Sequence, residues 1–189
     1  MKKVIGLTGT LGAGKNVVKD FLVRRFNSYH VSLSSIIMAE VEKKRMNFNR
    51  KALQELGNDL RKRYGTHILA MLAIEYLQRD KELIIVDGIR NPGEIDFLKK
   101  KFGNGFVLIA VDAPPEQRFE KLKKRGSERD PKTWEEFVEM DERDKGKGEP
   151  DYGQQVDRCL SRADFTVMND GTVEQLENKV NEIMNKIIS

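Results

Sequence analysis

Short apolar runs recur along the chain and alternate with stretches whose apolar residues follow helical spacing. Such runs predict β-strands, and their alternation with helices predicts an α/β fold with a parallel sheet covered on both faces. The first, third and fourth runs are almost entirely apolar, as is typical of central strands buried on both sides. The predicted strands are residues 4–8, 30–33, 83–86, 106–111 and 165–168.

Capping sequences mark two helix starts. Residues 91–94 read Asn-Pro-Gly-Glu, which offers an N-cap, a proline at the first helical position and an acid at the third. Thr172 and Gln175 have the spacing of a second capping box, and apolar residues at helical spacing follow them. Between residues 49 and 79 the apolar pattern is also helical, with a break near Gly65. We therefore predict two helices in that stretch.

The length of 189 residues fits a single domain, 1–189. Between residues 125 and 158 the apolar pattern thins, and charged residues and glycine dominate. Only a short helical face remains there, which includes Trp134 and Phe137. We interpret this segment as a mobile helix-and-loop excursion from the same domain, in which Trp134 serves for packing.

The composition narrows the class of protein. The net charge is +4, but 34 basic residues are interleaved with 30 acidic ones, so small phosphorylated ligands explain the balance as well as nucleic acid does. The single cysteine, Cys159, cannot form an internal disulfide and is expected to serve packing. The longest apolar run has seven residues, whereas a membrane span needs about 20. We expect a soluble, cytoplasmic protein without a membrane partner.

Residues 9–16 read Gly-Thr-Leu-Gly-Ala-Gly-Lys-Asn and carry the G-x-x-x-x-G-K part of the Walker A pattern, between an apolar strand and an amphipathic helix. Glycines let successive backbone N–H groups face a β-phosphate, and Lys15 reaches the β- and γ-phosphates. A turn that uses its glycines for strand packing alone is the alternative. The expected ATP-binding residues are Gly9, Thr10, Leu11, Gly12, Ala13, Gly14, Lys15, Asn16 and Val17.

Two residues are candidate Mg²⁺ ligands. Asn16 stands where Ser or Thr normally offers a hydroxyl, and Val17 offers none either. The Asn16 carbonyl oxygen can bind Mg²⁺, or phosphates and water can hold the metal. Asp87 follows the apolar run 83–86, which is the Walker B arrangement, and is expected to hold Mg²⁺ through water. Capping of a turn would also explain an aspartate at a strand end.

Residues 86–90, Val-Asp-Gly-Ile-Arg, resemble the Asp-Gly-Phe-Pro-Arg segment of nucleoside monophosphate kinases, of the adenylate kinase and dephospho-coenzyme A kinase superfamily. The resemblance spans nearly the whole chain. It implies a three-layer αβα P-loop NTPase fold of about five parallel strands, with an acceptor-binding helical insertion at about 34–80 and a lid at about 125–158. It also implies that Arg90 contacts the acceptor phosphate, although the proline before the arginine is missing.

The resemblance suggests further ligand-binding residues, each with a plainer alternative. Ser34 lies where such kinases begin their acceptor-binding helices, and Arg50 and Arg61 follow as candidate acceptor-phosphate ligands or as solvated helix positions. The loop at 169–172 would support adenine, which makes Asp170 and Gly171 candidates, although helix capping explains both residues.

Arginines of the charged segment are suited to phosphoryl transfer, because they neutralise the charged oxygens of the moving group. Arg125, Arg129 and Arg143 lie in the expected lid, and Arg118 on the preceding helix could reach the same phosphates. A surface helix with paired charges is the alternative. The candidate catalytic residues are Lys15, Asp87, Arg125, Arg129 and Arg143.

These features favour an ATP- and Mg²⁺-dependent phosphotransferase that acts on a small nucleotide, a nucleoside or deoxynucleoside monophosphate. Two alternatives stay open. Residues 163–171 resemble the C-terminal strand and loop of dephospho-coenzyme A kinases, but Ser32 and Ser34 stand where those enzymes have an aspartate. The missing hydroxyl and the basic pI would also fit an ATP-binding switch or slow ATPase that regulates a protein or RNA partner. A monomer and a homodimer both fit the sequence.

Overall fold

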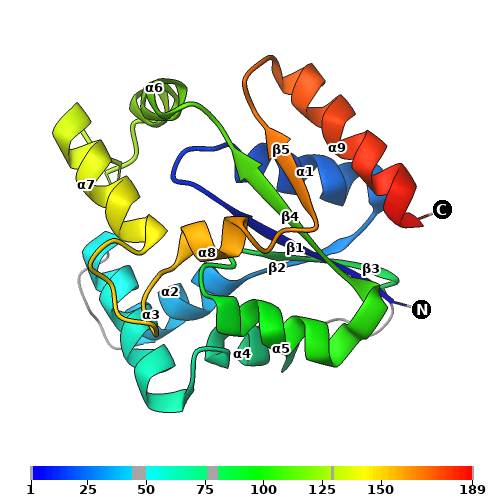
Figure 1. Ribbon diagram of the computed structural model, residues 1–189, viewed down its shortest axis with the longest axis horizontal. Helices are drawn as coiled ribbons and strands as arrows, with labels where there is room; N and C mark the ends of the chain where they lie inside the picture. Colours follow the sequence, from blue (N-terminus) through cyan, green and yellow to red (C-terminus); the bar gives the residue numbers. More distant parts are fainter. Residues whose placement is uncertain (1, 44–49, 76–80, 129, 189) are drawn as a thin grey trace.

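The computed structural model describes residues 2–43, 50–75, 81–128 and 130–188. Five parallel strands form one sheet in the order β2-β3-β1-β4-β5, which confirms the predicted architecture (Figure 1). Because the chain adds β3 on one side of β1 and β4 on the other, the carboxyl end of β1 is a topological switch point, where α/β sheets bind ligands. The strands are β1 (Lys3–Gly9), β2 (Tyr29–Ser32), β3 (Leu83–Asp87), β4 (Phe106–Asp112) and β5 (Phe165–Met168).

Two helices cover one face of the sheet, α1 (Lys15–Phe26) and α9 (Val173–Ile188). Alternate residues of a strand point to opposite faces, so Ile5 and Leu7 of β1 enter this layer. The apolar stripe of α9 meets them, through Leu176 and Val180 among others. The predicted capping box starts this helix, because Gln175 N donates to Thr172 Oγ1 and Thr172 N to Gln175 Oε1.

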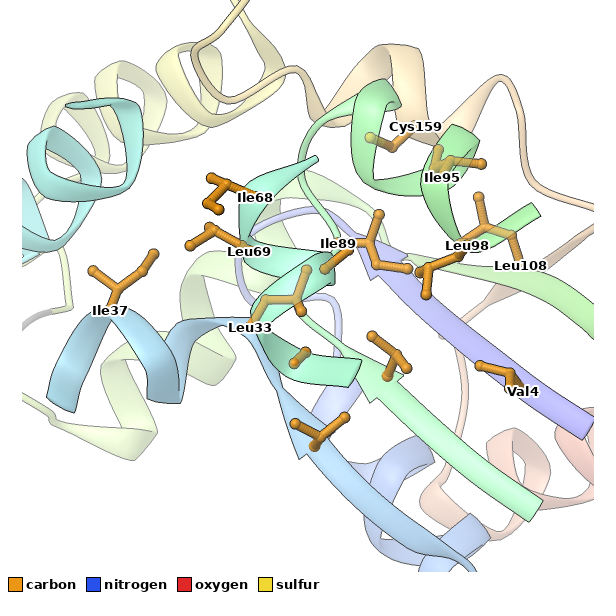
Figure 2. Close-up of a cluster of buried hydrophobic side chains, with 14 of the residues drawn as sticks. Val4, Leu33, Ile37, Ile68, Leu69, Ile89, Ile95, Leu98, Leu108 and Cys159 are labelled. Carbon is orange, nitrogen blue, oxygen red and sulfur yellow. The ribbon is translucent and has the colours of Figure 1, made fainter. Parts of the chain in front are cut away.

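The helices of the opposite layer are α2 (Leu33–Lys43), α3 (Arg50–Tyr64), α4 (Ile68–Glu75), α5 (Pro92–Phe102) and α8 (Val156–Leu160). Figure 2 shows the apolar cluster beneath them, in which Ile95 and Leu98 lie near Leu108. Cys159 of α8 is fully buried there, which confirms its packing role, and burial raises the pKa of its thiol. Together the two layers and the sheet form the predicted three-layer αβα fold.

The charged segment contains more structure than its composition suggests. It follows α6 (Pro115–Arg125) and contains α7 (Trp134–Lys145), and Figure 1 places both helices beyond the carboxyl ends of the strands. They share a small core in which Leu122 and Phe137 are buried. The Trp134 ring lies 5.2 Å from Phe137 and 5.5 Å from Phe119, which confirms its packing role.

Most predicted boundaries hold to within one residue. The second strand is Tyr29–Ser32, because Leu33 already begins α2. Gly65 lies between α3 and α4 with a φ of 97°, at the predicted helix break. Asn91 caps α5 as predicted, and its side chain accepts from Gly93 N. The short helix α8 was not predicted. Among the described residues, no helix has the length and apolar character to cross a membrane.

Candidate functional site

The loop between β1 and α1 has the backbone shape that the glycines predicted. Gly14 has a φ of 97°, and a Cβ added there would lie 2.4 Å from the Nδ2 atom of Asn169. A Cβ on Gly9 would lie 2.1 Å from the carbonyl oxygen of Val111. Both positions therefore need glycine for conformation and for space. The loop opens at the topological switch point and leads into the N-terminus of α1, where backbone N–H groups favour an anion.

Three side chains from other elements hold this loop. Thr10 Oγ1 donates to Asp112 Oδ1 at the end of β4 over 2.5 Å. Asn169 Nδ2 donates to Ala13 O over 2.8 Å, and Arg118 Nη1 donates to Leu11 O over 3.0 Å. The loop is therefore shaped before any ligand arrives, which reduces the conformational entropy that binding would cost.

Lys15 lies over the loop that it follows. Its Nζ donates to Gly9 O over 2.7 Å and to Thr10 O over 2.9 Å. Asn16, the next residue, is exposed and borders the two main cavities of this edge. The lysine ammonium thus rests on two backbone carbonyls that a phosphate group could replace.

Asp87 ends β3 directly beside β1, where it pairs in register with Leu7. Its Oδ1 is buried and has no hydrogen-bond partner among the described residues, and its Oδ2 lies 3.9 Å from His30 Nε2. Burial raises the pKa of Asp87, but His30, Lys15 and Arg90 outweigh it, so the pKa lies below its usual value. An ionised carboxylate with an unsatisfied oxygen beside the phosphate loop is suited to Mg²⁺ and its water ligands, so these residues fit the metal.

The first cavity, of about 460 Å³, extends along the phosphate loop. It contains Lys15, Asn16 and Asp87, as the sequence predicted, together with Gly171 of the expected adenine loop. Asp170 does not border it. Instead its exposed carboxylate pairs with Lys179 Nζ at 2.8 Å, which holds the pKa of Asp170 below its usual value. Asn169 of the same loop also borders the cavity, and the sequence missed Lys121 and Asp144, which border it as well.

The second cavity, of about 350 Å³, adjoins the first and shares residues with it. Three guanidinium groups from separate elements border it: Arg61 of α3, Arg90 after β3 and Arg125 at the end of α6. Ser34 lies between the two cavities. Four predicted ligand-binding residues are thus brought together although they are far apart in sequence. The shared residues are Asn16, Ser34, Gly88, Arg90 and Arg125.

A carboxylate holds each of these arginines. Arg61 Nη2 lies 2.8 Å from Glu94 Oε1, and both side chains are almost fully buried. Arg90 Nη1 lies 3.2 Å from Asp144 Oδ2, and Arg125 Nε donates to Asp130 Oδ2 over 2.7 Å. The pairing with Asp130 raises the pKa of Arg125. Each guanidinium is therefore oriented before an acceptor binds.

Two predicted phosphate ligands lie elsewhere, and the expectation for them is corrected. Arg118 is 1% exposed, and Leu11 O, Ala113 O and the Asp141 carboxylate occupy its guanidinium, so it has no access to a phosphate in this arrangement. Arg143 Nε donates to Glu149 Oε1 over 2.7 Å and borders a separate cavity of about 170 Å³.

Two further candidates cannot be placed. Arg129 and the side chain of Arg50 lie outside the described part of the chain, so their expected phosphate contacts stay predictions.

Comparisons with known proteins identify the family of the chain and structures that share its fold. A family model described as an AAA domain matches residues 8–138. UPF0200 protein MJ1399 of Methanocaldococcus jannaschii is 32% identical over 189 residues, which cover 98% of this chain and 91% of the relative. UPF0200 protein TK1334 of Thermococcus kodakarensis is 31% identical over 191 residues and covers 98% of both chains.

Solved structures share the fold at lower identity. TT1252 from Thermus thermophilus superposes with a TM-score of 0.60 at 20% identity and covers 98% of this chain and 97% of its own. A shikimate kinase from Acinetobacter baumannii, solved with shikimate, gives a TM-score of 0.59 at 14% identity and covers 100% and 94%. These identities show the fold alone. From the family model and the relatives, the chain belongs to the UPF0200 family and contains an AAA domain.

Proposed function

We propose that the protein is an ATP-dependent phosphotransferase that transfers the γ-phosphate to a nucleoside or deoxynucleoside monophosphate. One observation carries the proposal. Arg61, Arg90 and Arg125 converge on a cavity that adjoins the cavity of Lys15 and Asp87. An acceptor cavity lined by arginines beside a phosphate-binding loop is suited to a substrate that itself carries phosphate, because a guanidinium binds phosphate oxygens through charge-assisted hydrogen bonds.

On the donor side, the loop N–H groups and Lys15 would bind the phosphates of ATP. Lys15 would exchange its hydrogen bonds with Gly9 O and Thr10 O for bonds to phosphate oxygens. Bound Mg²⁺ would neutralise charge on the phosphates. Asp87 would hold a water of the metal, and Asn16 would offer its carbonyl oxygen in place of the usual hydroxyl. Arg125, which borders both cavities, would stabilise the transferring group.

On the acceptor side, Arg90 and Arg61 would bind the phosphate of the monophosphate. A phosphate oxygen carries negative charge near neutral pH, with a second pKa of about 6, so it can attack without a general base. The carboxylates at the cavities are consistent with an acceptor that needs no general base, because each of them already faces a cation. Asp130 and Asp144 are engaged with Arg125 and Arg90, and Asp87 faces Lys15. A hydroxyl acceptor would instead need one of these carboxylates to take a proton.

An acceptor screen tests the proposal. ADP release would be measured with Mg²⁺-ATP and each of a set of acceptors: the common nucleoside and deoxynucleoside monophosphates, dephospho-coenzyme A and shikimate. We expect turnover with at least one monophosphate and a rise in its KM of about tenfold or more for Arg90→Gln, since a charge-assisted hydrogen bond is worth about 1.5–3 kcal/mol. Arg24→Gln is the matched control, because Arg24 is exposed on α1 and pairs with Glu177 of α9, in the layer that does not contain the acceptor helices.

The outcomes separate the candidate functions. ATP-analogue binding without acceptor-dependent ADP release would sink the proposal. Slow hydrolysis that no acceptor accelerates would favour the ATP-binding switch, for which the missing hydroxyl at Asn16 is the supporting feature. Transfer to dephospho-coenzyme A or shikimate alone would assign a hydroxyl acceptor.

A further inference from the structure

Two buried amide side chains border the acceptor cavity. Gln54 lies on α3 and Gln154 just before α8, 100 residues later in the sequence, and they are 6% and 7% exposed. Gln54 also borders the smaller cavity of about 170 Å³, so it stands between the two. Each amide has one end bound to another side chain. The bound partner determines which end faces away from it.

The orientation of Gln54 follows from Asp144. Gln54 Nε2 donates to Asp144 Oδ1 over 2.6 Å. A carboxylate only accepts hydrogen bonds, so the NH₂ end of the amide must face Asp144. The carbonyl oxygen Oε1 therefore remains for other partners, and it has none among the described residues. Gln54 thus offers a hydrogen-bond acceptor.

The orientation of Gln154 follows from Arg90 and is the reverse. Arg90 Nη1 donates to Gln154 Oε1 over 3.1 Å. A guanidinium only donates, so the carbonyl end must face Arg90 and the NH₂ group remains for other partners. No hydrogen bond engages that NH₂ group within the described part of the chain. Gln154 thus offers a hydrogen-bond donor, and Arg90 Nη1 also contacts Asp144, which joins the two amides in one network.

We propose that Gln54 and Gln154 recognise the nucleobase of the acceptor, through one carbonyl oxygen and one NH₂ group of fixed polarity. The proposal rests on the proposed function and deepens it. The base would offer an N–H group to Gln54 and a lone pair to Gln154. Apolar side chains of the same cavity, Leu33, Ile37, Leu53 and Leu69, would contact the faces of the ring. Arg61 and Arg90 would bind the phosphate at the same time.

Fixed polarity predicts discrimination between bases of the same shape. AMP and IMP differ at the six-position, where an amino group becomes a carbonyl and the neighbouring ring nitrogen gains a hydrogen. CMP and UMP differ in the same way. If each base of a pair binds in the same position, one base places its N–H group against the Gln54 carbonyl oxygen and its lone pair against the Gln154 NH₂ group. The other base places acceptor against acceptor and donor against donor. We expect at least one pair to differ in Kd by about tenfold or more.

The variant Asp144→Asn tests whether the Asp144 carboxylate determines which end of the Gln54 amide faces the cavity. Arg90 can only donate, so it would take the carbonyl oxygen of the new amide and leave the NH₂ group toward Gln54. Gln54 would then have to turn its own carbonyl oxygen to that group and present its NH₂ group outward. The variant should reduce the discrimination to about threefold or less, or reverse it.

The experiment is calorimetric titration of AMP, IMP, CMP and UMP into protein saturated with Mg²⁺ and a non-hydrolysable ATP analogue. The proteins are wild type, Asp144→Asn, Gln154→Met and the control Gln117→Met, whose glutamine is exposed on α6. Gln154→Met should also lose the discrimination, which keeps the test decisive if Asp144→Asn fails to fold. Circular dichroism and ATP-analogue binding identify a variant that has not folded.

Each outcome decides the question. Equal affinities within both pairs in wild type would overturn the inference and leave the phosphotransferase proposal standing. Discrimination that survives in both Asp144→Asn and Gln154→Met would overturn it as well. If no monophosphate binds while the ATP analogue does, both the base recognition and the monophosphate acceptor fall. Discrimination in binding without any ADP release would instead remove the transfer activity and keep the recognition.

Discussion

At the scale of single residues, the most specific prediction concerns Lys15 and its contact with the phosphates. Its ammonium group donates hydrogen bonds to two carbonyl oxygens of the loop that would bind phosphate, Gly9 O and Thr10 O. Phosphate oxygens would replace these two carbonyl oxygens as hydrogen-bond acceptors. The fold of the domain does not depend on this contact, because the apolar layers lie elsewhere.

Lys15→Ala should lower kcat by about 100-fold or more, since one lost charge contact to the transferring phosphate is worth about 3 kcal/mol. Circular dichroism and the thermal midpoint should change little. Lys19→Ala on the same helix is the control, because Lys19 Nζ lies 2.9 Å from Oδ1 of its neighbour Asp20 and Lys19 does not border the donor cavity. Activity of Lys15→Ala close to that of wild type would contradict the assigned role.

The sequence predicted residues whose role follows from local geometry. Gly14 and Lys15 belong to one continuous pattern, and Asp87 ends an apolar strand, so their meeting follows from the parallel sheet. Gln54, Asp144 and Gln154 could not be found in this way. Glutamine and aspartate are common on solvated helices, and only the tertiary fold brings Gln54 of α3 and Asp144 of α7 within hydrogen-bond distance across 90 positions. Arg118 is the opposite case: the sequence predicted it as a phosphate ligand, and nothing in its local sequence indicates that its side chain is buried.

At the scale of elements, the expected lid is attached to the phosphate loop by a buried ion pair. Arg118 of α6 bonds Leu11 O and, through Nη2, Asp141 Oδ2 of α7 at 2.9 Å. Lys145 adds a second cation at 2.8 Å from Asp141 Oδ2. The Arg118 guanidinium also lies 5.1 Å from the centre of the Phe137 ring. The helix α7 is thus packed on the donor site in this arrangement.

Arg118→Met should lower the free energy of unfolding by about 3 kcal/mol, because it leaves the Asp141 carboxylate buried with one partner fewer. The double variant Arg118→Met/Asp141→Leu should be less destabilised than the single variant, since no charge is then left without its partner. Urea unfolding measures both. A double variant that is more unstable than Arg118→Met would contradict the ion-pair account and indicate simple loss of packing.

The same ion pair should depend on pH. Burial raises the pKa of Asp141, but Arg118 and Lys145 outweigh it, so the pKa lies below its usual value. The stabilisation is therefore fully present above a pH of about 4 and is lost as the pH falls through the pKa of the folded state. The stability difference between wild type and Arg118→Met should shrink over that range.

At the scale of the whole molecule, the sequence predicted the layers and the sheet because burial on both faces gives central strands a continuous apolar pattern. It did not predict the arrangement of α6 and α7, where the core is small and the polar contacts are long-range. Leu122 and Phe137 form one buried cluster with Leu11 of the phosphate loop. The charged composition of the segment conceals this core, which explains why the sequence indicated a looser excursion.

Cys159 gives the protein a built-in chemical reporter. It is the only cysteine of the sequence, it is fully buried on α8, and burial raises the pKa of its thiol. A thiol reagent reacts with an exposed thiolate, so modification near neutral pH requires α8 to leave the sheet. The backbone N–H of Gln155, just before α8, donates to Arg90 O over 2.7 Å, which links this opening to the acceptor site.

Labelling of Cys159 should be about 100-fold slower or more in the native protein than in urea, because an opening that costs about 3 kcal/mol exposes the thiol less than 1% of the time. An acceptor that binds at Arg90 should slow it further. Absorbance of the coloured group that the thiol reagent releases measures the labelling rate with and without acceptor, and no label has to be introduced into the protein. Equal rates in native and unfolded protein would show that α8 does not protect the thiol. The sulfur atom of Cys159 would thus report the rate at which α8 opens locally in the layer that supports the acceptor site.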